Sequence, residues 1–186
     1  MTMTENPILN GVNVEALLGA RAALTEAPPA AAFVWKATCD WVSGTHATTE
    51  VTGFFGLGQD HERSCGGHRI DTDHPEVFAS EDKGMTPTEA VLAGLAGCLA
   101  AGVATVAANR GITLNSVRAS IEADMDLQGV LGIDPDVRNG FGEVRVAFDI
   151  DADATDEEIA ALVAQSQKRS AVYDLLTNPT SVVVTS

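Results

Sequence analysis

The sequence is poor in basic and aromatic residues. Its 186 residues include 11 lysines and arginines against 26 aspartates and glutamates, for a formal net charge of −15, and aromatic residues make up only 5%. A strongly acidic surface repels phosphate groups, so the composition argues against nucleic-acid binding and against docking on an anionic membrane. Because aromatic residues are few, the core must rest on Ala, Val, Leu and Ile. Hydrophobic residues make up 45% of the chain, which is enough for the core of one domain or of two small ones.

Cysteine is also scarce. The chain has three, Cys39, Cys65 and Cys98. An odd and sparse count argues against a disulfide scaffold and fits the reducing cytoplasm. The N-terminal stretch MTMTENPIL has neither the basic nor the apolar region of a signal peptide, so we expect a cytoplasmic protein.

The first 30 residues carry weak structural signals. Residues 1–12 read as a loose tail, and Asn13 is a candidate N-cap for a short helix that must end before Pro28 and Pro29. We therefore expect residues 1–30 to form a tail, a short helix and a proline-rich linker. The main domain is expected to span residues 31–186.

Alternating apolar and polar residues predict strands on both sides of one long helix. Before that helix, the pattern predicts strands at 33–41, 45–52 and near 67–72, a break at 53–58 and an acidic loop at 74–84. After it, the pattern predicts a hairpin of strands at 117–126 and 144–150, a helix at 156–169, a short helix after Ser170 and a closing strand at 182–184. Helices do not alternate with strands one by one, so the fold class is α+β with an antiparallel sheet.

One face of the first predicted strand is assigned to the core. Trp35, Cys39 and Trp41 share that face, because side chains two residues apart point to the same side of a strand. Cys39 is therefore expected to be a core residue, whereas Cys65, beside two glycines, is expected to be accessible.

The longest predicted element is a helix over residues 86–110. Thr86-Pro87-Thr88-Glu89 is a capping box with proline at the first helical position, and residues 90–108 carry no charge. The run is long enough to weigh a membrane span, but eleven of these 19 residues are Ala or Gly and no second segment is comparable. We expect a soluble protein whose helix is buried on all sides. Ala93, Gly97 and Ala101 form a stripe of small residues, which favours packing against a second copy in a homodimer.

The segment Gly84–Cys98 resembles the central-helix signature of the OsmC/Ohr family, the osmotically inducible and organic hydroperoxide resistance proteins. The shared features are a glycine, a helix start with proline and glutamate, a run of small residues and a cysteine about ten residues on. The resemblance extends from about residue 33 to the C-terminus and includes Val137–Phe141 before an alternating strand. It implies an OsmC-like fold, with antiparallel sheets around a long buried central helix, in an interwoven homodimer.

The same resemblance implies thiol-dependent reduction of organic hydroperoxides in oxidative stress defence, without a cofactor or a metal. Cys98 matches the cysteine that attacks the peroxide. Arg69 matches the arginine that, with a glutamate, orients and activates this cysteine. Glu89 lies within one position of that glutamate. Each has an ordinary alternative: a solvated strand charge for Arg69 and a capping-box partner for Glu89. The family's second, resolving cysteine corresponds to Ser170, so this chain resembles the single-cysteine form.

Three functions stay open on the residues alone. The first is a peroxidase acting through Cys98, with an external thiol, Cys65 or Cys39 as the resolver. Cys98 lies about three turns into its own helix, so a reactive thiolate there requires an arginine from elsewhere, and the alternative is a small buried hydrophobe. The second is a small-molecule or thiol-binding protein without turnover. The third is a metal site in the group that comprises His46, His61, Cys65, His68 and His74.

Overall fold

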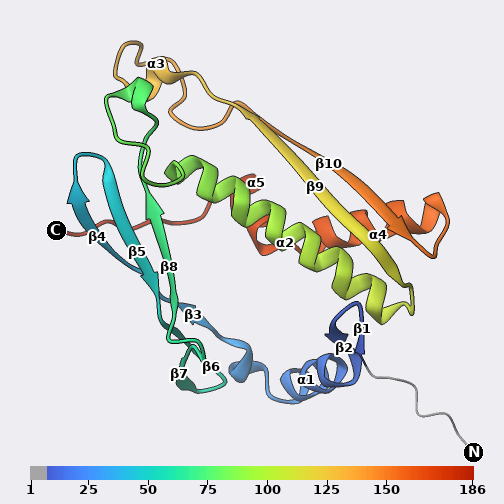
Figure 1. Cartoon of the computed structure of the whole chain (residues 1–186). Coiled ribbons are helices and arrows are strands. Elements are labelled where there is room, and N and C mark those ends of the chain that lie inside the picture. Colours follow the sequence, from blue (N-terminus) through green and yellow to red (C-terminus); the bar gives the residue numbers. More distant parts are fainter. Residues whose placement is uncertain (1–7) are drawn as a thin grey trace, which may run out of the picture. The chain divides into compact units, whose positions relative to one another are not determined.

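The computed structural model describes residues 8–186, which divide into two compact units (Figure 1). The first unit combines the N-terminal residues up to Val12 with Gly94–Ser186, and the second is Asn13–Ala93. The helix α2, Pro87–Asn109, runs through the boundary.

The second unit begins with the predicted N-terminal helix. The Asn13 side chain accepts a hydrogen bond of 2.9 Å from the backbone N–H of Ala16, and α1 follows as Val14–Glu26. The helix ends at the prolines as expected, because a 3₁₀ turn, Pro28–Ala31, replaces the α-helix there.

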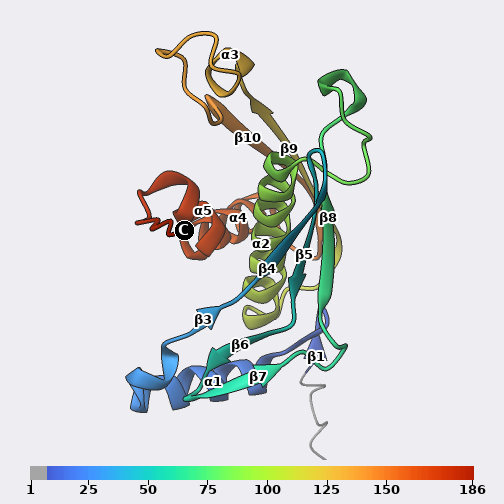
Figure 2. The same ribbon diagram turned by 90° about the vertical axis from the view of Figure 1, so that its left-hand side faces the viewer.

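Two three-stranded antiparallel sheets make up most of this unit (Figure 2). One has the order β3-β6-β7 and the other β4-β5-β8. The strands are β3 Val34–Trp35, β4 Thr38–Ser43, β5 His46–Val51, β6 Gly53–Gly56, β7 Gln59–Glu62 and β8 His68–Thr72.

The predicted break at residues 53–58 is wrong, because β6 and β7 form a hairpin there. Its turn is Leu57-Gly58, and both residues have positive φ, 51° and 79°. This backbone suits a two-residue hairpin, but Leu is an unusual residue at its first position, so the sequence lacks the Asn-Gly or Asp-Gly pair that usually identifies such a hairpin.

The core assignment of the first strand is also wrong. Trp35 is 66% and Trp41 is 74% exposed, and Cys39 is exposed as well. The alternation correctly predicts strands, but the described chain does not cover the apolar face that the alternation creates.

A buried aspartate organises the loop that leads to α2. Asp73 is 1% exposed and accepts hydrogen bonds from Thr45 Oγ1 at 2.6 Å, from the N–H of His74 at 2.8 Å and from the N–H of Lys83 at 3.1 Å. The hydrogen bond from Thr45, followed by the one from Lys83, holds the pKa of Asp73 at about 2. This carboxylate therefore fixes both ends of the predicted acidic loop, which contains a single 3₁₀ turn, Glu76–Phe78.

The first unit contains the predicted hairpin and helices. β9 Leu114–Asp124 and β10 Glu143–Ala152 pair antiparallel, with Val144 opposite Ala123 (Figure 1). The long connection between them includes a short helix, α3 Leu127–Val130, which no strong pattern predicts. The chain continues with α4 Asp156–Arg169 and α5 Ala171–Thr177.

The core of this unit lies between the C-terminal half of α2, helix α4 and the β9–β10 hairpin. Its buried residues are Val103, Val106, Ala107, Ile112 and Leu162. Partly buried apolar residues of β9 and β10, among them Val117, Phe148 and Ile150, pack against them. The core thus consists of aliphatic residues and one phenylalanine, as the low aromatic content predicts.

Both chain ends differ from the prediction. Residues 1–7 of the predicted tail lie outside the described residues, but Ile8–Leu9 and Val12–Asn13 pair as β1 and β2. The Asn10 side chain donates to the carbonyl of Ile112 and accepts from the N–H of Leu114, each at 2.9 Å, so an amide side chain secures this segment. No strand forms at 182–184, where the three valines are 79–89% exposed because no strand within residues 8–186 pairs with them.

The central helix is only partly covered in the single chain. Leu95, Leu99, Val103 and Val106 are buried, whereas the small-residue stripe of Ala93, Gly97 and Ala101 is exposed. One chain thus leaves this face of the helix open, and burial on all sides, which was expected with a second copy in a homodimer, stays a prediction. By length and composition alone, α2 is the one helix of residues 8–186 that is able to cross a membrane.

Candidate functional site

Both ends of α2 are fixed by local hydrogen bonds. At its start, the N–H of Thr86 donates to Glu89 Oε2 at 2.7 Å and the N–H of Glu89 donates to Thr86 Oγ1 at 3.2 Å, which confirms the capping box. At its end, Gly111 has a φ of 72° and Ile112 donates to the carbonyl of Ala107 at 2.9 Å, as in a Schellman motif. Cys98 thus lies in the middle of a rigid helix.

Cys98 contacts the junction between α4 and α5. The Ser170 hydroxyl donates a hydrogen bond to Cys98 Sγ at 3.1 Å, and Ser170 is only 5% exposed. The same hydroxyl accepts from the N–H of Tyr173 at 3.1 Å, which confirms Ser170 as the N-cap of α5. The N-cap bond holds the oxygen in place, so the hydroxyl proton is directed toward the sulfur.

These contacts favour the thiolate form of Cys98. Burial by itself raises the pKa of the Cys98 thiol, but hydrogen bonds from the Ser170 hydroxyl and from the N–H groups of Val172 and Ala171 more than compensate and lower it below the ordinary value. The stabilising groups come from the first turn of α5 rather than from an arginine. A nucleophilic thiol needs this kind of surrounding, a partly buried sulfur that faces several hydrogen-bond donors.

A second serine, one turn earlier on α4, holds this junction against α2. Ser166 is buried, and its hydroxyl donates to the carbonyl of Leu99 at 2.7 Å. A side chain on Gly102 would collide with Ser166, so glycine is required for this close approach of the two helices. Ser166 and Ser170, four residues apart, thus present their hydroxyls to neighbouring residues of α2.

Glu89 and Arg69 belong to the second unit. Glu89 serves the capping box, and nine residues separate it from Cys98, so the two side chains of one chain leave α2 on opposite faces. Arg69 donates to both carboxylate oxygens of Asp71, at 3.0 and 3.2 Å, and to Thr48 Oγ1 at 3.1 Å. The hydrogen bond from Arg69 is the largest cause of a strongly lowered pKa of Asp71. The contacts of Arg69 thus fit a solvated strand charge, and those of Glu89 fit a capping-box partner. The roles of both residues at Cys98 stay predictions.

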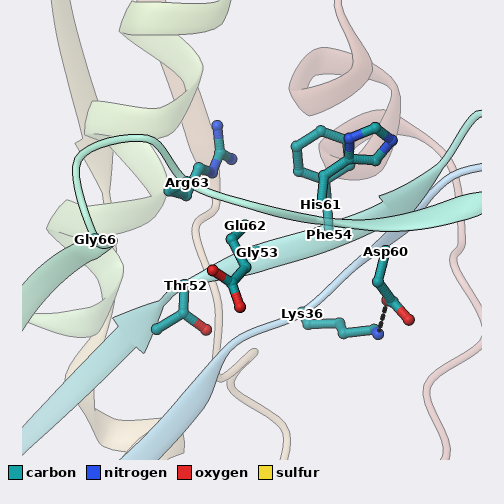
Figure 3. Close-up of a pocket in the computed structure, with 9 residues that line it drawn as sticks. All are labelled: Lys36, Thr52, Gly53, Phe54, Asp60, His61, Glu62, Arg63 and Gly66. Atoms are coloured by element: carbon teal, nitrogen blue, oxygen red, sulfur yellow. Dashed lines mark hydrogen bonds and ion pairs between the residues drawn. The ribbon is translucent and has the colours of Figure 1, made fainter.

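The histidines do not gather into a metal site. His61 Nε2 lies 3.0 Å from the carbonyl oxygen of Gly56, and its ring stacks on Phe54 at a centroid distance of 4.9 Å (Figure 3). His68 Nε2 lies 3.7 Å from Cys65 Sγ. Among residues 8–186, no three side chains of His, Cys, Asp or Glu are grouped closely enough to hold an ion.

Sequence reasoning missed the hydrogen bonds that Ser170 and Ser166 donate. The resemblance aligns Ser170 with the cysteine that resolves Cys98, but it does not predict that the Ser170 hydroxyl donates to the Cys98 sulfur across 72 positions of sequence. The available signal was the four-residue spacing of Leu162, Ser166 and Ser170, which places Leu162 and Ser166 on one face of α4 and Ser170 directly after its last residue.

The chain matches the family model described as "OsmC-like protein" over residues 80–185, more than half of its length. The chain therefore belongs to the OsmC-like protein family. The match covers α2 and every later helix and strand, including Cys98 and Ser170. No curated protein matches the chain.

Solved structures confirm the fold. An OsmC-like protein from Mycoplasma pneumoniae is 20% identical, with a TM-score of 0.58 over 76% of this chain and 86% of that one. An organic hydroperoxide resistance protein OsmC from Legionella pneumophila is 19% identical, with a TM-score of 0.54 over 77% and 90%. A putative organic hydroperoxide resistance protein from Vibrio cholerae, with captopril bound in one active site, is 14% identical, with a TM-score of 0.50 over 77% and 85%. These likenesses support the predicted α+β fold around a central helix.

Proposed function

We propose that this protein reduces organic hydroperoxides through Cys98, with an external thiol as the reductant. The observation that carries the proposal is the environment of Cys98: three hydrogen-bond donors face its sulfur and lower the pKa of the thiol. Membership of the OsmC-like family and the fold shared with organic hydroperoxide resistance proteins support the choice of peroxide as substrate.

The reaction follows from thiolate chemistry. The Cys98 thiolate attacks one oxygen of the hydroperoxide, a sulfur–oxygen bond forms, the O–O bond breaks, and the departing alkoxide takes a proton to become an alcohol. Cys98 is then a sulfenic acid. An external thiol attacks its sulfur and releases water, and a second thiol cleaves the resulting mixed disulfide to restore Cys98 and form a disulfide.

We infer a homodimer as the working form. The exposed stripe on α2 supports it, because a Cβ placed on Gly94 or Gly97 meets no atom within 4 Å. A second copy packed on this stripe buries the apolar helix that one chain leaves open. In that assembly Arg69 or Glu89 of the second copy is the candidate partner of Cys98.

The direct test is a peroxide-consumption assay on the full chain. Cumene hydroperoxide and hydrogen peroxide are compared, with dithiothreitol or dihydrolipoamide as reductant and Cys98→Ser as the matched control that keeps Cys39 and Cys65. We expect multiple turnovers with cumene hydroperoxide and none with the control. Equal consumption by the two proteins excludes the proposal.

A second candidate function is small-molecule or thiol binding without turnover. Ser170 favours it, because a hydroxyl next to Cys98 is unable to form the internal disulfide that protects a sulfenic acid. The captopril-bound relative from Vibrio cholerae supports a ligand at the corresponding place. Labelling of one Cys98 per chain, without repeated peroxide consumption, distinguishes this function from the first.

A further inference from the structure

The β3-β6-β7 sheet carries a row of planar rings on one face, although aromatic residues are few in this chain. Trp35 pairs with Phe54, and Phe54 pairs with His61, so the three side chains lie side by side across the sheet. The ring centroids of Trp35 and Phe54 are 5.2 Å apart, and those of Phe54 and His61 are 4.9 Å apart. Phe33 extends the row, at 5.8 Å from Trp35 and 5.9 Å from Phe54. We call these four residues the aromatic row.

Local contacts hold the rings of the aromatic row in place. His61 Nε2 lies 3.0 Å from the carbonyl oxygen of Gly56, and because a carbonyl only accepts, this nitrogen carries the ring proton. A Cβ on Gly56 would collide with the ring of Phe33, so the glycine allows that ring to lie against the strand. A surface that is already ordered loses little entropy when a planar group stacks on it.

A guanidinium lies over the aromatic row. Arg63 Cζ is 5.4 Å from the ring centroid of Phe54 and 6.0 Å from that of Trp35. The backbone of Arg63 is held by a hydrogen bond of 2.8 Å from its N–H to the carbonyl of Thr52. Figure 3 shows the guanidinium on the same side of the β6–β7 hairpin as the rings of Phe54 and His61. The row therefore has a positive charge at a fixed place beside it.

Arg63 has no carboxylate partner, unlike most basic residues of the second unit. Three of the five Lys and Arg residues in Asn13–Ala93 form ion pairs of 2.5 to 3.0 Å with carboxylates, namely Lys36, Arg69 and Lys83. Among residues 8–186, no carboxylate forms such a pair with Arg63, and its buried Nε has no hydrogen-bond partner. In a chain with 26 acidic and 11 basic residues, an unpaired guanidinium of this kind is suited to an anion from outside the chain.

A cavity of about 430 Å³ borders the aromatic row. Phe54, His61 and Arg63 line it, together with Lys36, which forms an ion pair with Asp60. The carboxylates of Asp60 and Glu62 lie on the opposite side of the hairpin from the Arg63 guanidinium, as Figure 3 shows and as the alternation along β7 requires. Arg63 is thus the lining cation left for a ligand, and the volume admits a ring with a short acidic chain.

We propose that the aromatic row and Arg63 bind a small aromatic carboxylate, a function separate from that of Cys98. The ring of the ligand stacks on the exposed part of the row, at Phe33 and Trp35, and its carboxylate pairs with Arg63. The rings alone would accept any apolar molecule and the guanidinium alone any anion, so the ligand needs both features. Binding uses no peroxide and no residue of the Cys98 environment, so this function and the proposed peroxidase can fail independently.

The test uses three compounds of similar size that separate the charge from the ring. 3-Phenylpropionate carries both, 3-phenylpropan-1-ol carries the ring alone, and 3-cyclohexylpropionate carries the charge without a planar ring. The protein is the full chain with Trp41→Phe, in which Trp35 is the one remaining tryptophan. Binding is followed by Trp35 emission and by saturation-transfer NMR of each compound. We expect saturable binding of 3-phenylpropionate, about tenfold weaker binding of the alcohol and about threefold weaker binding of the cyclohexyl acid.

A substitution at Arg63 tests the guanidinium directly. Arg63→Gln should weaken the binding of 3-phenylpropionate about tenfold and leave that of the alcohol unchanged. Arg21→Gln is the matched control, because it removes the other unpaired guanidinium of this unit, on α1, and should bind as the parent does. Circular dichroism checks that each variant folds. The comparison of the three compounds needs no variant at Arg63, so it tests the proposal even if Arg63→Gln does not fold.

Three results would overturn the proposal. They are equal affinity for the three compounds, parental affinity in folded Arg63→Gln, and no saturation transfer from the protein to 3-phenylpropionate at millimolar concentration. If no compound binds and Trp35 emission changes with protein concentration, a second copy of the chain covers the aromatic row instead.

Discussion

The two faces of α2 have opposite surroundings although both are built from small and aliphatic residues. On one face, Leu99 and Val103 are buried and Gly102 lies so close to Ser166 that no side chain fits. On the other face, a Cβ added to Gly97 would meet no atom within 4 Å, and Ala101 is exposed. A glycine in a uniformly apolar helix can thus allow close packing within one chain, or it can leave a surface free for a second chain. The composition of the helix does not distinguish these two roles.

The largest expected effect is on the covered face. Gly102→Leu places a branched side chain against Ser166 and α4, and overpacking of this kind should lower the free energy of unfolding by about 3 kcal/mol. Urea unfolding followed by circular dichroism measures it. Gly97→Leu, the same substitution on the open face, is the matched control, and an equal loss in both variants would contradict the distinction between the faces.

The same Gly97→Leu variant should act on association instead. The chain is expected to fold, because nothing in it occupies the space beside Gly97, but the proposed dimer should weaken about a hundredfold. Sedimentation velocity at low micromolar concentration compares it with wild type. A wild-type protein that is already a stable monomer there removes the basis for the dimer.

Much of the fold was predictable because local signals agree with it. The capping boxes at Thr86 and Thr155, the glycine that ends α2 and the alternation of β9 and β10 each depend on residues close together in the chain. The failures have one local cause and two non-local ones. The β6–β7 turn lacks its usual residues, Asn10 is ordered by contacts with residues more than 100 positions away, and the exposure of Trp41 reflects the absence of a covering layer within residues 8–186.

The third prediction concerns Ser170, which the resemblance aligns with a second cysteine of the family. In Ser170→Cys, the new sulfur takes the place of an oxygen that lies 3.1 Å from Cys98 Sγ, so one equivalent of cumene hydroperoxide should produce a disulfide between positions 98 and 170. Overoxidation of Cys98 under excess peroxide should fall about tenfold, since the disulfide removes the sulfenic acid.

Non-reducing peptide mapping checks both parts of this prediction. Wild type is the control, and there Cys98 should gain two or three oxygens. A Cys65–Cys98 disulfide already present in oxidised wild type would instead make Cys65 the resolving residue.

A smaller effect is expected from Ser170→Ala. The variant removes one hydrogen bond from the Cys98 thiolate, so the pKa of Cys98 should rise and the labelling curve with iodoacetamide should move to higher pH. At pH 7 the rate should fall about fivefold, as loss of one hydrogen bond predicts. Ser166→Ala, which removes a hydroxyl that bonds Leu99 rather than Cys98, should leave the pH midpoint in place. A midpoint that stays fixed in Ser170→Ala would show that the backbone N–H groups alone set the thiol's acidity.

The candidate site was predictable only in part. The cysteine was recognisable because its helix carries a family signature, and Ser170 was recognisable as a departure from it. Its role as a hydrogen-bond donor was not, because an N-cap serine normally directs its oxygen to its own helix, and only the packing of α4 on α2 brings the same hydroxyl to the sulfur.

Because the chain is synthesised from its N-terminus, the covered face of α2 stays uncovered for a time during translation. Val103 leaves the ribosome 59 residues before Leu162, its partner in the core. At about 5–20 residues per second, that interval lasts about 3–12 s. During it, a 23-residue apolar helix has neither α4 nor a second copy to cover it, and its length and composition match those of a membrane-spanning segment. The yield of folded protein therefore depends on what shields this helix during translation, as well as on the stability of the finished fold.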